Sequence, residues 1–246
     1  MRALALIAIL GAVAGPVLAA APAPKKILVV SVTKGFRHES IPTAERVIEA
    51  IGKESGAYAV DFARTDEELL AKTTVAALAG YHGVFFANTT GDLPLADRQA
   101  FLAWIAKGNA FLGLHSATDT FHGFPPFIAM LGAEFDYHKA QVKVEPKVED
   151  AKSPATRGIA PGLAVLDEIY IMKSFDKARV HPLLSLDKHP NTGEPGYFPL
   201  AWTREEGKGR VFYTAFGHRE DVLEADWYKQ HLVGGIRWAL RLDGGR

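Results

Sequence analysis

The segment ILVVSVTKGFRHESIPTAERVIEAIGKE, residues 27–54, decides the fold class. Its first six residues form a continuous apolar run rich in β-branched side chains, which is typical of a strand covered on both faces. Ser40 fits the N-cap of a helix over residues 41–54, and Pro42 falls in the first turn, where proline is tolerated. A buried strand that leads into a helix predicts one unit of a parallel α/β sheet.

The same alternation of short apolar runs and helical periods continues through the first half of the chain. Residues 65–68 read Thr-Asp-Glu-Glu, a capping box that predicts the start of a short helix toward Leu70. The spacing therefore predicts a mostly parallel sheet with helices on both faces. The further strands are expected at 58–62, 83–87 and 110–114, and a second long helix at 94–106.

The second half of the chain has strands without long helices between them. Strands are expected at 142–145 and 169–172, and a hairpin at 200–215 turns at residues 205–209. A helix over 222–242 closes the chain. Because we find no internal repeat and no long linker, we expect a single domain over residues 26–242, with this half forming an antiparallel extension of the sheet.

Composition excludes several classes of protein. The 246 residues include no cysteine, which rules out a thiol nucleophile, a thiolate metal site and a disulfide framework. With 28 basic and 28 acidic residues the formal charge is zero, so no nucleic-acid partner is expected. A hydrophobic content of 48% supplies a core and argues against disorder. The oligomeric state is left open.

Residues 1–20 resemble a secretory signal peptide. Arg2 provides a short positive region, residues 3–17 are apolar, and Val17-Leu18-Ala19 fits the pattern of small residues before a cleavage site. We expect cleavage near Ala19 and a periplasmic or secreted protein, with an uncleaved anchor as the alternative. No later apolar run approaches 18 residues, so no membrane span is expected after removal of the leader.

Polar loops follow the expected parallel strands, and histidines are concentrated in them. Because ligands of such sheets bind outside the carboxyl ends of the strands, these loops are the place to search for a site. We predict that His38, His115 and His218 meet in one pocket, with His122 or His138 at its rim. The alternative is an ordinary structural role for each imidazole, solvated in a loop or buried against the backbone.

Four segments of these loops stand out: Gly35-Phe36-Arg37-His38, Gly113-Leu114-His115-Ser116-Ala117, Phe121-His122-Gly123 and Phe216-Gly217-His218. Together they resemble the ThuA-like family, which is named for trehalose utilisation and belongs to the class I glutamine amidotransferase-like superfamily. The resemblance covers about residues 26–240. It implies a flavodoxin-like three-layer α/β/α sandwich, with a mostly parallel sheet and an antiparallel extension. It also implies a link to carbohydrate catabolism, which in some members proceeds through keto-sugar forms of disaccharides.

The same resemblance limits the chemistry. Glutamine amidotransferases place a nucleophilic cysteine in a turn after a central strand, and His115 stands at that place here. Thiolate chemistry and ammonia transfer from glutamine are thereby excluded. Ser116 is one position away and lacks the Gly-x-Ser-x-Gly elbow of serine hydrolases. The His-x-Glu pattern near the chain end is kept as His218 and Glu220, so the resemblance implies catalytic roles for His115, His218 and Glu220.

Two kinds of site remain open. In the first, imidazoles and nearby carboxylates such as Asp119 and Glu220 bind a divalent metal such as zinc, which polarises a keto-sugar carbonyl. The candidate ligands are His38, His115, His122, His138 and His218. In the second, the same groups work as acids and bases without a metal. Candidate sugar-binding residues are Arg37, His38, Asn88, Thr118, Phe121, His122 and Tyr137, and the rings of Phe36 and Phe124 are further stacking candidates unless they pack in the core.

The sequence thus favours an exported carbohydrate-processing protein whose partner is a small carbohydrate. As an enzyme it would act on a disaccharide or its keto derivative by hydrolysis or elimination, as a glycoside hydrolase or lyase. The alternative is a non-catalytic sugar-binding or accessory protein that has the amidotransferase-like fold without its cysteine.

Overall fold

A twisted sheet of eight strands forms the centre of the molecule, and the computed structural model describes it within residues 24–242. Its strands are β1 (Lys25–Val30), β2 (Tyr58–Ala63), β3 (Gly83–Ala87), β4 (Ala110–Leu114), β7 (Lys147–Val148), β10 (His181–Lys188), β11 (Pro195–Glu206) and β12 (Gly209–Thr214). Their order is β2-β1-β3-β4-β12-β11-β10-β7. The first five in this order are parallel, and the last three extend the sheet antiparallel. This order of parallel strands is that of flavodoxin-like sheets.

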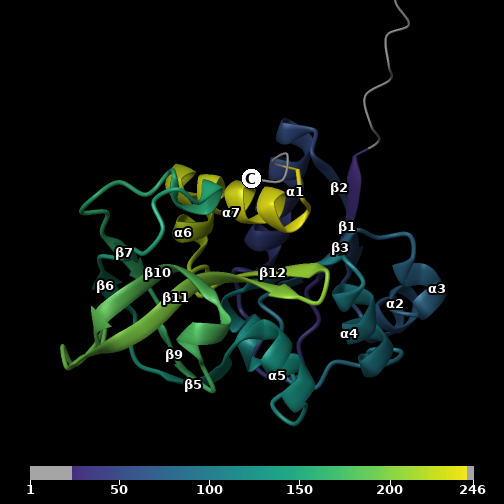
Figure 1. The fold of residues 1–246 in the computed structure, drawn as a ribbon, viewed down its shortest axis with the longest axis horizontal. Helices are drawn as coiled ribbons and strands as arrows, with labels where there is room; N and C mark the ends of the chain where they lie inside the picture. Colours follow the sequence, from purple (N-terminus) through teal and green to yellow (C-terminus); the bar gives the residue numbers. More distant parts are fainter. Residues whose placement is uncertain (1–23, 243–246) are drawn as a thin grey trace, which may run out of the picture.

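Two small antiparallel sheets lie beside the extension. One pairs β5 (Glu134–His138) with β9 (Tyr170–Lys173), and the other pairs β6 (Val142–Val144) with β8 (Val165–Asp167). In Figure 1, β5 and β9 lie under the long β10–β11 hairpin. The short connection from β8 to β9 contains Glu168 and joins these two small sheets.

Helices cover both faces of the sheet, as Figure 1 shows. On one face, α1, α6 and α7 pack against the strands, and α2, α3, α4 and α5 pack against the other. The helices are α1 (Ile41–Ser55), α2 (Asp66–Lys72), α3 (Val75–Leu78), α4 (Arg98–Ala106), α5 (Pro125–Leu131), α6 (Glu220–Glu224) and α7 (Asp226–Ala239), with short 3-10 turns η1 (His115–Asp119), η2 (Pro154–Thr156) and η3 (Lys177–Arg179).

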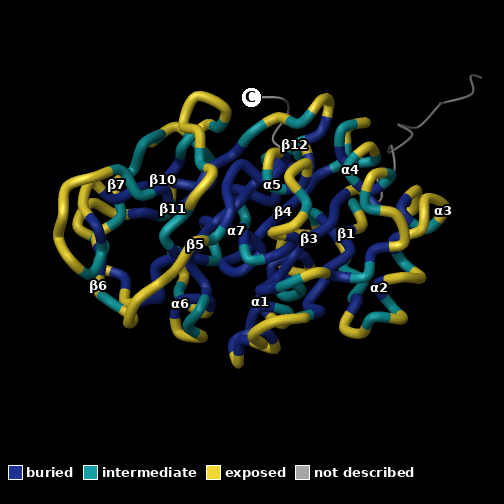
Figure 2. The backbone as a smooth tube through the Cα atoms, turned by 90° about the horizontal axis from the view of Figure 1, so that it is seen from below, coloured by how far each residue is buried: buried dark blue, intermediate teal, exposed yellow. Residues whose placement is uncertain are grey.

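Strand β1 shows how the sequence produces these layers. Ile27 and Val29 point into the core under α1 and α7, whereas Leu28 and Val30 point into the core under α2 to α5. All four side chains are fully buried, and in Figure 2 the buried residues run through the middle of the molecule. The continuous apolar run therefore has the two-sided burial expected of a central parallel strand.

The predicted fold class is confirmed: the protein is a three-layer α/β sandwich with a mostly parallel sheet and an antiparallel extension. The predicted capping box is also present, since Thr65 Oγ1 accepts a hydrogen bond from the Glu68 amide at 3.2 Å. The hairpin at the expected turn is the β11–β12 connection.

Three local expectations differ from the structure. The helix expected at 94–106 begins only at Arg98, because the Asp97 side chain caps it by accepting from the Ala100 amide. The helix expected at 222–242 is divided into α6 and α7 by the extended backbone of Ala225. Ser40 precedes α1, but its hydroxyl donates to the Gly217 carbonyl instead of capping the helix.

Among the described residues, no helix is both long enough and apolar enough to span a membrane. The predicted signal peptide, residues 1–20, lies outside the described part of the chain.

Candidate functional site

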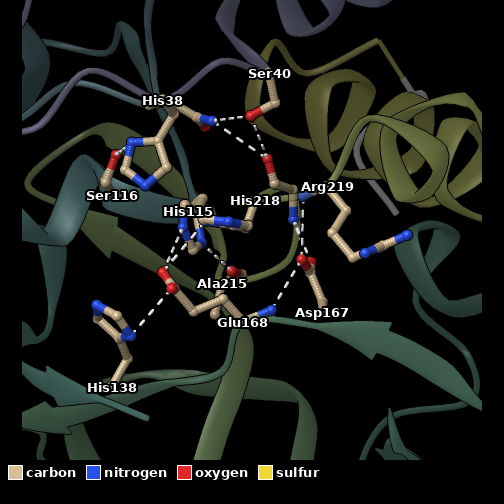
Figure 3. A network of polar contacts seen from close by, with 12 residues as sticks. His38, Ser40, His115, Ser116, His138, Asp167, Glu168, Ala215, His218 and Arg219 are labelled. Carbon is tan, nitrogen blue, oxygen red and sulfur yellow. Dashed lines mark hydrogen bonds and ion pairs between the residues drawn. The ribbon is translucent and has the colours of Figure 1, made fainter. Parts of the chain in front are cut away.

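Loops after three strands of the sheet bring His38, His115 and His218 together (Figure 3). His38 follows β1, His115 follows β4 and His218 follows β12. The ring centroids lie 4.8 Å apart for His38 and His115, 5.2 Å for His38 and His218, and 5.3 Å for His115 and His218. The predicted meeting of these three histidines is therefore observed, and its cause is the shared carboxyl edge of the parallel strands.

His115 occupies a tight turn at the end of β4. Its φ of 45° lies in the left-handed region, which costs free energy for a residue with a Cβ atom and often marks functional sites. Gly113 permits the turn, since a Cβ atom there would lie 3.0 Å from the Tyr213 ring and 3.2 Å from Ala117. The His115 side chain is fully buried, and its Nδ1 lies 2.8 Å from the Ala215 carbonyl oxygen. With Nδ1 directed at that carbonyl, Nε2 is the ring nitrogen that faces the Glu168 carboxylate, 3.5 Å away.

His38 is buried beside His115, with 3% of its surface exposed. Its Nδ1 lies 3.4 Å from the hydroxyl of Ser116. Burial, followed by the neighbouring imidazoles of His115 and His218, lowers the pKa of His38 to about 3. At neutral pH His38 is therefore an uncharged imidazole.

Glu168, in the connection between β8 and β9, is the carboxylate of the cluster. Its Oε2 lies 3.5 Å from His115 Nε2 and 3.2 Å from His218 Nδ1, and its Oε1 lies 3.0 Å from His138 Nδ1. Burial alone would raise the pKa of Glu168, but the imidazoles of His115 and His218 outweigh it and hold the pKa far below its usual range. In return, the Glu168 carboxylate raises the pKa of His218 against the effect of burial.

Sequence reasoning missed Glu168. A signal was present, because Asp167 and Glu168 interrupt an otherwise apolar segment at residues 163–170. Two adjacent carboxylates within a buried strand pair need partners, since acidic side chains are almost never fully buried alone.

Asp167 holds the backbone of the site. Its carboxylate accepts hydrogen bonds from the amides of Gly217 at 2.8 Å, Arg219 at 3.1 Å and Glu168 at 3.0 Å. Figure 3 shows it beneath the chain that carries His218. This one buried carboxylate therefore fixes both the His218 loop and the turn that presents Glu168.

A pocket of about 680 Å³ opens beside the cluster. Its walls include Phe36, Arg37, His218 and Glu220. The His218 side chain is 22% exposed, whereas His38 and His115 lie behind it in the interior. The imidazole of His218 is thus the part of the cluster that a molecule in the pocket would meet first.

The structure places Glu220 at the start of α6, exposed on the pocket wall. The carboxylate that contacts the imidazoles of His115 and His218 is Glu168, not Glu220. His138 borders the cluster through the outer oxygen of Glu168, as its predicted place at the rim requires. Arg37 is exposed at the pocket and donates to the Ser31 carbonyl.

Three of the predicted sugar-binding residues lie in the core instead of the pocket. Asn88 is fully buried and donates to the Ser40 hydroxyl and the Gly217 carbonyl, which ties the loops after β1, β3 and β12 together. The Thr118 hydroxyl is buried against Tyr213, and the Phe121 ring packs among other phenylalanines. All three side chains are buried, so none of them faces the pocket. Tyr137 is 40% exposed on β5, where its hydroxyl lies 3.3 Å from His189 Nε2.

His122 forms a separate ion-paired contact with two carboxylates. Its Nε2 lies 2.6 Å from Asp119 Oδ1 and its Nδ1 lies 2.6 Å from Glu134 Oε1, while Lys173 Nζ lies 3.7 Å from the same Glu134 oxygen. Partial burial would lower the pKa of His122, but the carboxylates of Asp119 and Glu134 outweigh it and raise the pKa above 6.5. Both ring nitrogens of His122 are paired with these carboxylates, so this predicted metal ligand lies apart from the cluster of His38, His115 and His218.

This contact predicts a pH-dependent stability. A raised pKa means that the stabilisation by His122 is complete below the unfolded-state pKa of 6.5 and is lost as the pH rises through the folded-state pKa. We expect His122→Ala to lower the free energy of unfolding at pH 5.5 more than at pH 9. The difference should be about 0.2–1 kcal/mol, since the side chain is 38% exposed and solvent screens the pair. Urea titrations at the two pH values measure it, and a deficit that grows toward pH 9 would contradict the assignment.

The family model described as "ThuA: Trehalose utilisation" matches residues 26–239. Solved structures give the same result for the fold. A putative ThuA-like protein from Bacteroides uniformis is 22% identical over 92% of this chain and 95% of its own, with a TM-score of 0.71. A second putative ThuA-like protein, from Parabacteroides merdae, is 18% identical over 88% of this chain and 90% of its own, with a TM-score of 0.70.

A cytoplasmic protein from Salmonella typhimurium has a TM-score of 0.60 at 14% identity, over 87% of this chain and 99% of its own. At these identities the solved structures establish the fold alone. No curated protein matches the chain.

Proposed function

The chain belongs to the ThuA family of trehalose utilisation, which gives it a carbohydrate-related role, and from this premise we propose that it is a carbohydrate-processing enzyme. Its substrate in this proposal is a disaccharide or the keto derivative of one, cleaved by hydrolysis or elimination. We further propose that the protein is exported to the periplasm or secreted after removal of residues 1–20 near Ala19.

The observation that carries the proposal is the pocket with His218 in its wall. The pocket combines an exposed aromatic ring, Phe36, with the guanidinium of Arg37 and carboxylates such as Glu220. Sugar recognition needs such a combination, because a pyranose has apolar C–H faces and a rim of hydroxyl groups. The cluster of His38, His115, His218 and Glu168 then provides chemistry at one end of this pocket.

The arrangement suits removal of a proton next to a sugar carbonyl. In the proposed elimination, Glu220 takes the proton from the carbon beside the carbonyl, and the negative charge passes to the carbonyl oxygen. When the carbonyl re-forms, a double bond forms between the deprotonated carbon and its neighbour on the far side from the carbonyl. The bond from that neighbour to the glycosidic oxygen breaks, and the oxygen takes the proton back from Glu220. An electrophile facing the carbonyl oxygen stabilises the intermediate charge. His218, whose pKa the Glu168 carboxylate raises, is the member of the cluster that reaches the pocket.

One observation favours a non-catalytic sugar-binding protein as the second candidate. His38 and His115 are almost entirely buried, and the turn after β4 carries His115 where amidotransferases have their cysteine. A fold that retained the pocket without a usable nucleophile would bind a sugar and leave it unchanged.

A panel of glucosides and 3-keto-glucosides separates the two candidates. Product analysis by mass spectrometry that shows time-dependent cleavage supports the enzyme. Saturable binding in calorimetry without any product supports the binding protein, and neither cleavage nor binding across the panel would contradict both.

Phe36 offers a direct test of sugar binding in this pocket. Its side chain is 66% exposed at the pocket, with its ring edge-on to His38 at 4.9 Å. We expect Phe36→Ala to raise KM for an accepted sugar about 10-fold and to change kcat much less, because stacking on the ring stabilises substrate and transition state alike. Tyr137→Ala removes another exposed aromatic ring and is the matched control. An equal effect of the two variants would contradict the assignment.

A further inference from the structure

We propose that His38, His115, His218 and Glu168 bind one divalent transition-metal cation of the zinc type at the inner end of the pocket. The inference rests on the proposed function for the role of the cation. Its binding is argued from the donor atoms alone.

The spacing of the four donor groups is that of a metal centre. One ligand atom from each side chain lies within 4.8 Å of the others. Two of the separations, Glu168 Oε2 to His218 Nδ1 at 3.2 Å and to His115 Nε2 at 3.5 Å, can be compared with a tetrahedral site. Zinc bound at about 2.0–2.1 Å from nitrogen and oxygen holds neighbouring ligands about 3.3–3.4 Å apart. These two separations are thus close to those that such a cation imposes, and the other donor atoms lie within 4.8 Å.

Two of these donor atoms are buried without a hydrogen bond of good geometry. Within the described part of the chain, His115 Nε2 and His218 Nδ1 make no such bond, and each instead faces the same oxygen of the Glu168 carboxylate, at 3.5 and 3.2 Å. The His115 side chain is 0% exposed, and its Nε2 points toward the centre of the cluster. An unpartnered buried polar atom costs about 1–3 kcal/mol, so such atoms are rare and call for a partner. A cation at the centre of the cluster gives both nitrogens that partner.

The contacts behind the cluster are those that orient metal ligands. A metal-bound histidine usually donates its other ring N–H to a carbonyl or carboxylate, which directs the lone pair at the metal. His115 Nδ1 has such a contact with the Ala215 carbonyl at 2.8 Å. The second oxygen of Glu168 is held by His138 Nδ1 at 3.0 Å, which fixes the rotation of that carboxylate.

The donor set selects the class of cation. Three imidazole nitrogens and one carboxylate oxygen suit zinc and its neighbours among the first-row transition metals. Magnesium and calcium prefer an all-oxygen set of ligands. Copper(I) prefers sulfur ligands, and this chain has no cysteine. The cation also extends the proposed function, because His218 borders the pocket and a substrate oxygen can reach the cation from that side as a fifth ligand. A cation in contact with the carbonyl oxygen stabilises the negative charge that develops there.

Metal content of the full-length chain tests the inference. The protein is stripped with a chelator, loaded with Zn²⁺, separated from free ion and measured by mass spectrometry for zinc. Cobalt(II) absorption then reports the coordination of the bound ion. We expect one zinc per chain in the wild type and binding weaker by about 100-fold or more in Glu168→Gln and His218→Ala.

His181→Ala and His122→Ala are the controls. Both histidines pair with carboxylates outside the cluster, so these two variants would lose zinc if the bound zinc were adventitious and held there. These controls should bind zinc as the wild type does. Glu168→Gln preserves the shape of the side chain, and thermal melts establish that each variant is folded. A wild type without retained zinc, or folded cluster variants that bind it normally, would overturn the inference. Bound zinc without cleavage of any glycoside contradicts only the proposed function, and cleavage at the full rate by the zinc-free chain contradicts only the role of the cation in that function.

Discussion

Replacing His115 by Asn is expected to lower the turnover of an accepted glycoside by about 10³-fold. The imidazole Nε2 of His115 is buried, faces Glu168 and is part of the group of donors at the inner end of the pocket. Asn removes that nitrogen from the cluster. It also tolerates the left-handed backbone at this position, where φ is 45°, better than Ala does. Its amide can donate to the Ala215 carbonyl that His115 now contacts, so the variant should fold.

His231 supplies a matched control for this experiment. It is also a fully buried histidine whose Nδ1 contacts a backbone carbonyl, that of Ala155 at 2.7 Å, but it lies on α7 away from the pocket. His231→Asn should lower stability and leave kcat within about threefold of the wild type. Steady-state kinetics of both variants, at a temperature where both are folded, separate the two effects. If His115→Asn kept wild-type turnover, the cluster would have no part in catalysis.

The fold could be predicted because its decisive signals are local. The apolar run of β1 needs burial on both faces, and the Thr65 capping box starts α2 through one side-chain hydrogen bond. Signals that depend on partners far away in the sequence were misread. Ser40 has the sequence appearance of a helix cap, yet its hydroxyl bonds to Gly217, which is 177 residues away. The break at Ala225 has no glycine or proline to mark it.

The same difference between local signals and distant partners explains which parts of the site could be predicted. His38, His115 and His218 could be placed together because parallel strands bring their carboxyl ends to one edge of the sheet. Glu168 could not, because it arrives from the β8–β9 connection, and no sequence rule relates those small antiparallel sheets to the central one. Asn88 and Phe121 also follow parallel strands, but Asn88 bonds to neighbouring loops and Phe121 packs against other phenylalanines, so both are taken up in the interior.

Asp167 is the residue whose replacement should most disturb the stability of the site. We expect Asp167→Asn to lower the free energy of unfolding by about 2–4 kcal/mol. Three backbone amides, of Gly217, Arg219 and Glu168, donate to this buried carboxylate. Asn has the same shape but only one accepting oxygen, so its NH2 group would face an amide that is itself a donor. At least one buried N–H then loses its partner, and the charge that strengthens the other bonds is gone.

Denaturant titrations of Asp167→Asn and Asp187→Asn measure this difference. Asp187 is exposed on β10, so its replacement should change the free energy of unfolding by no more than about 0.5 kcal/mol. Turnover of the Asp167 variant should also fall under conditions where it is folded, because the amides of Gly217 and Arg219 flank His218 and the amide of Glu168 sets its turn. Equal stability of the two variants would show that the loop after β12 is held by other contacts. His218 would then be positioned by two other hydrogen bonds. Asn88 donates one to the Gly217 carbonyl, and Tyr228 donates the other to the Phe216 carbonyl.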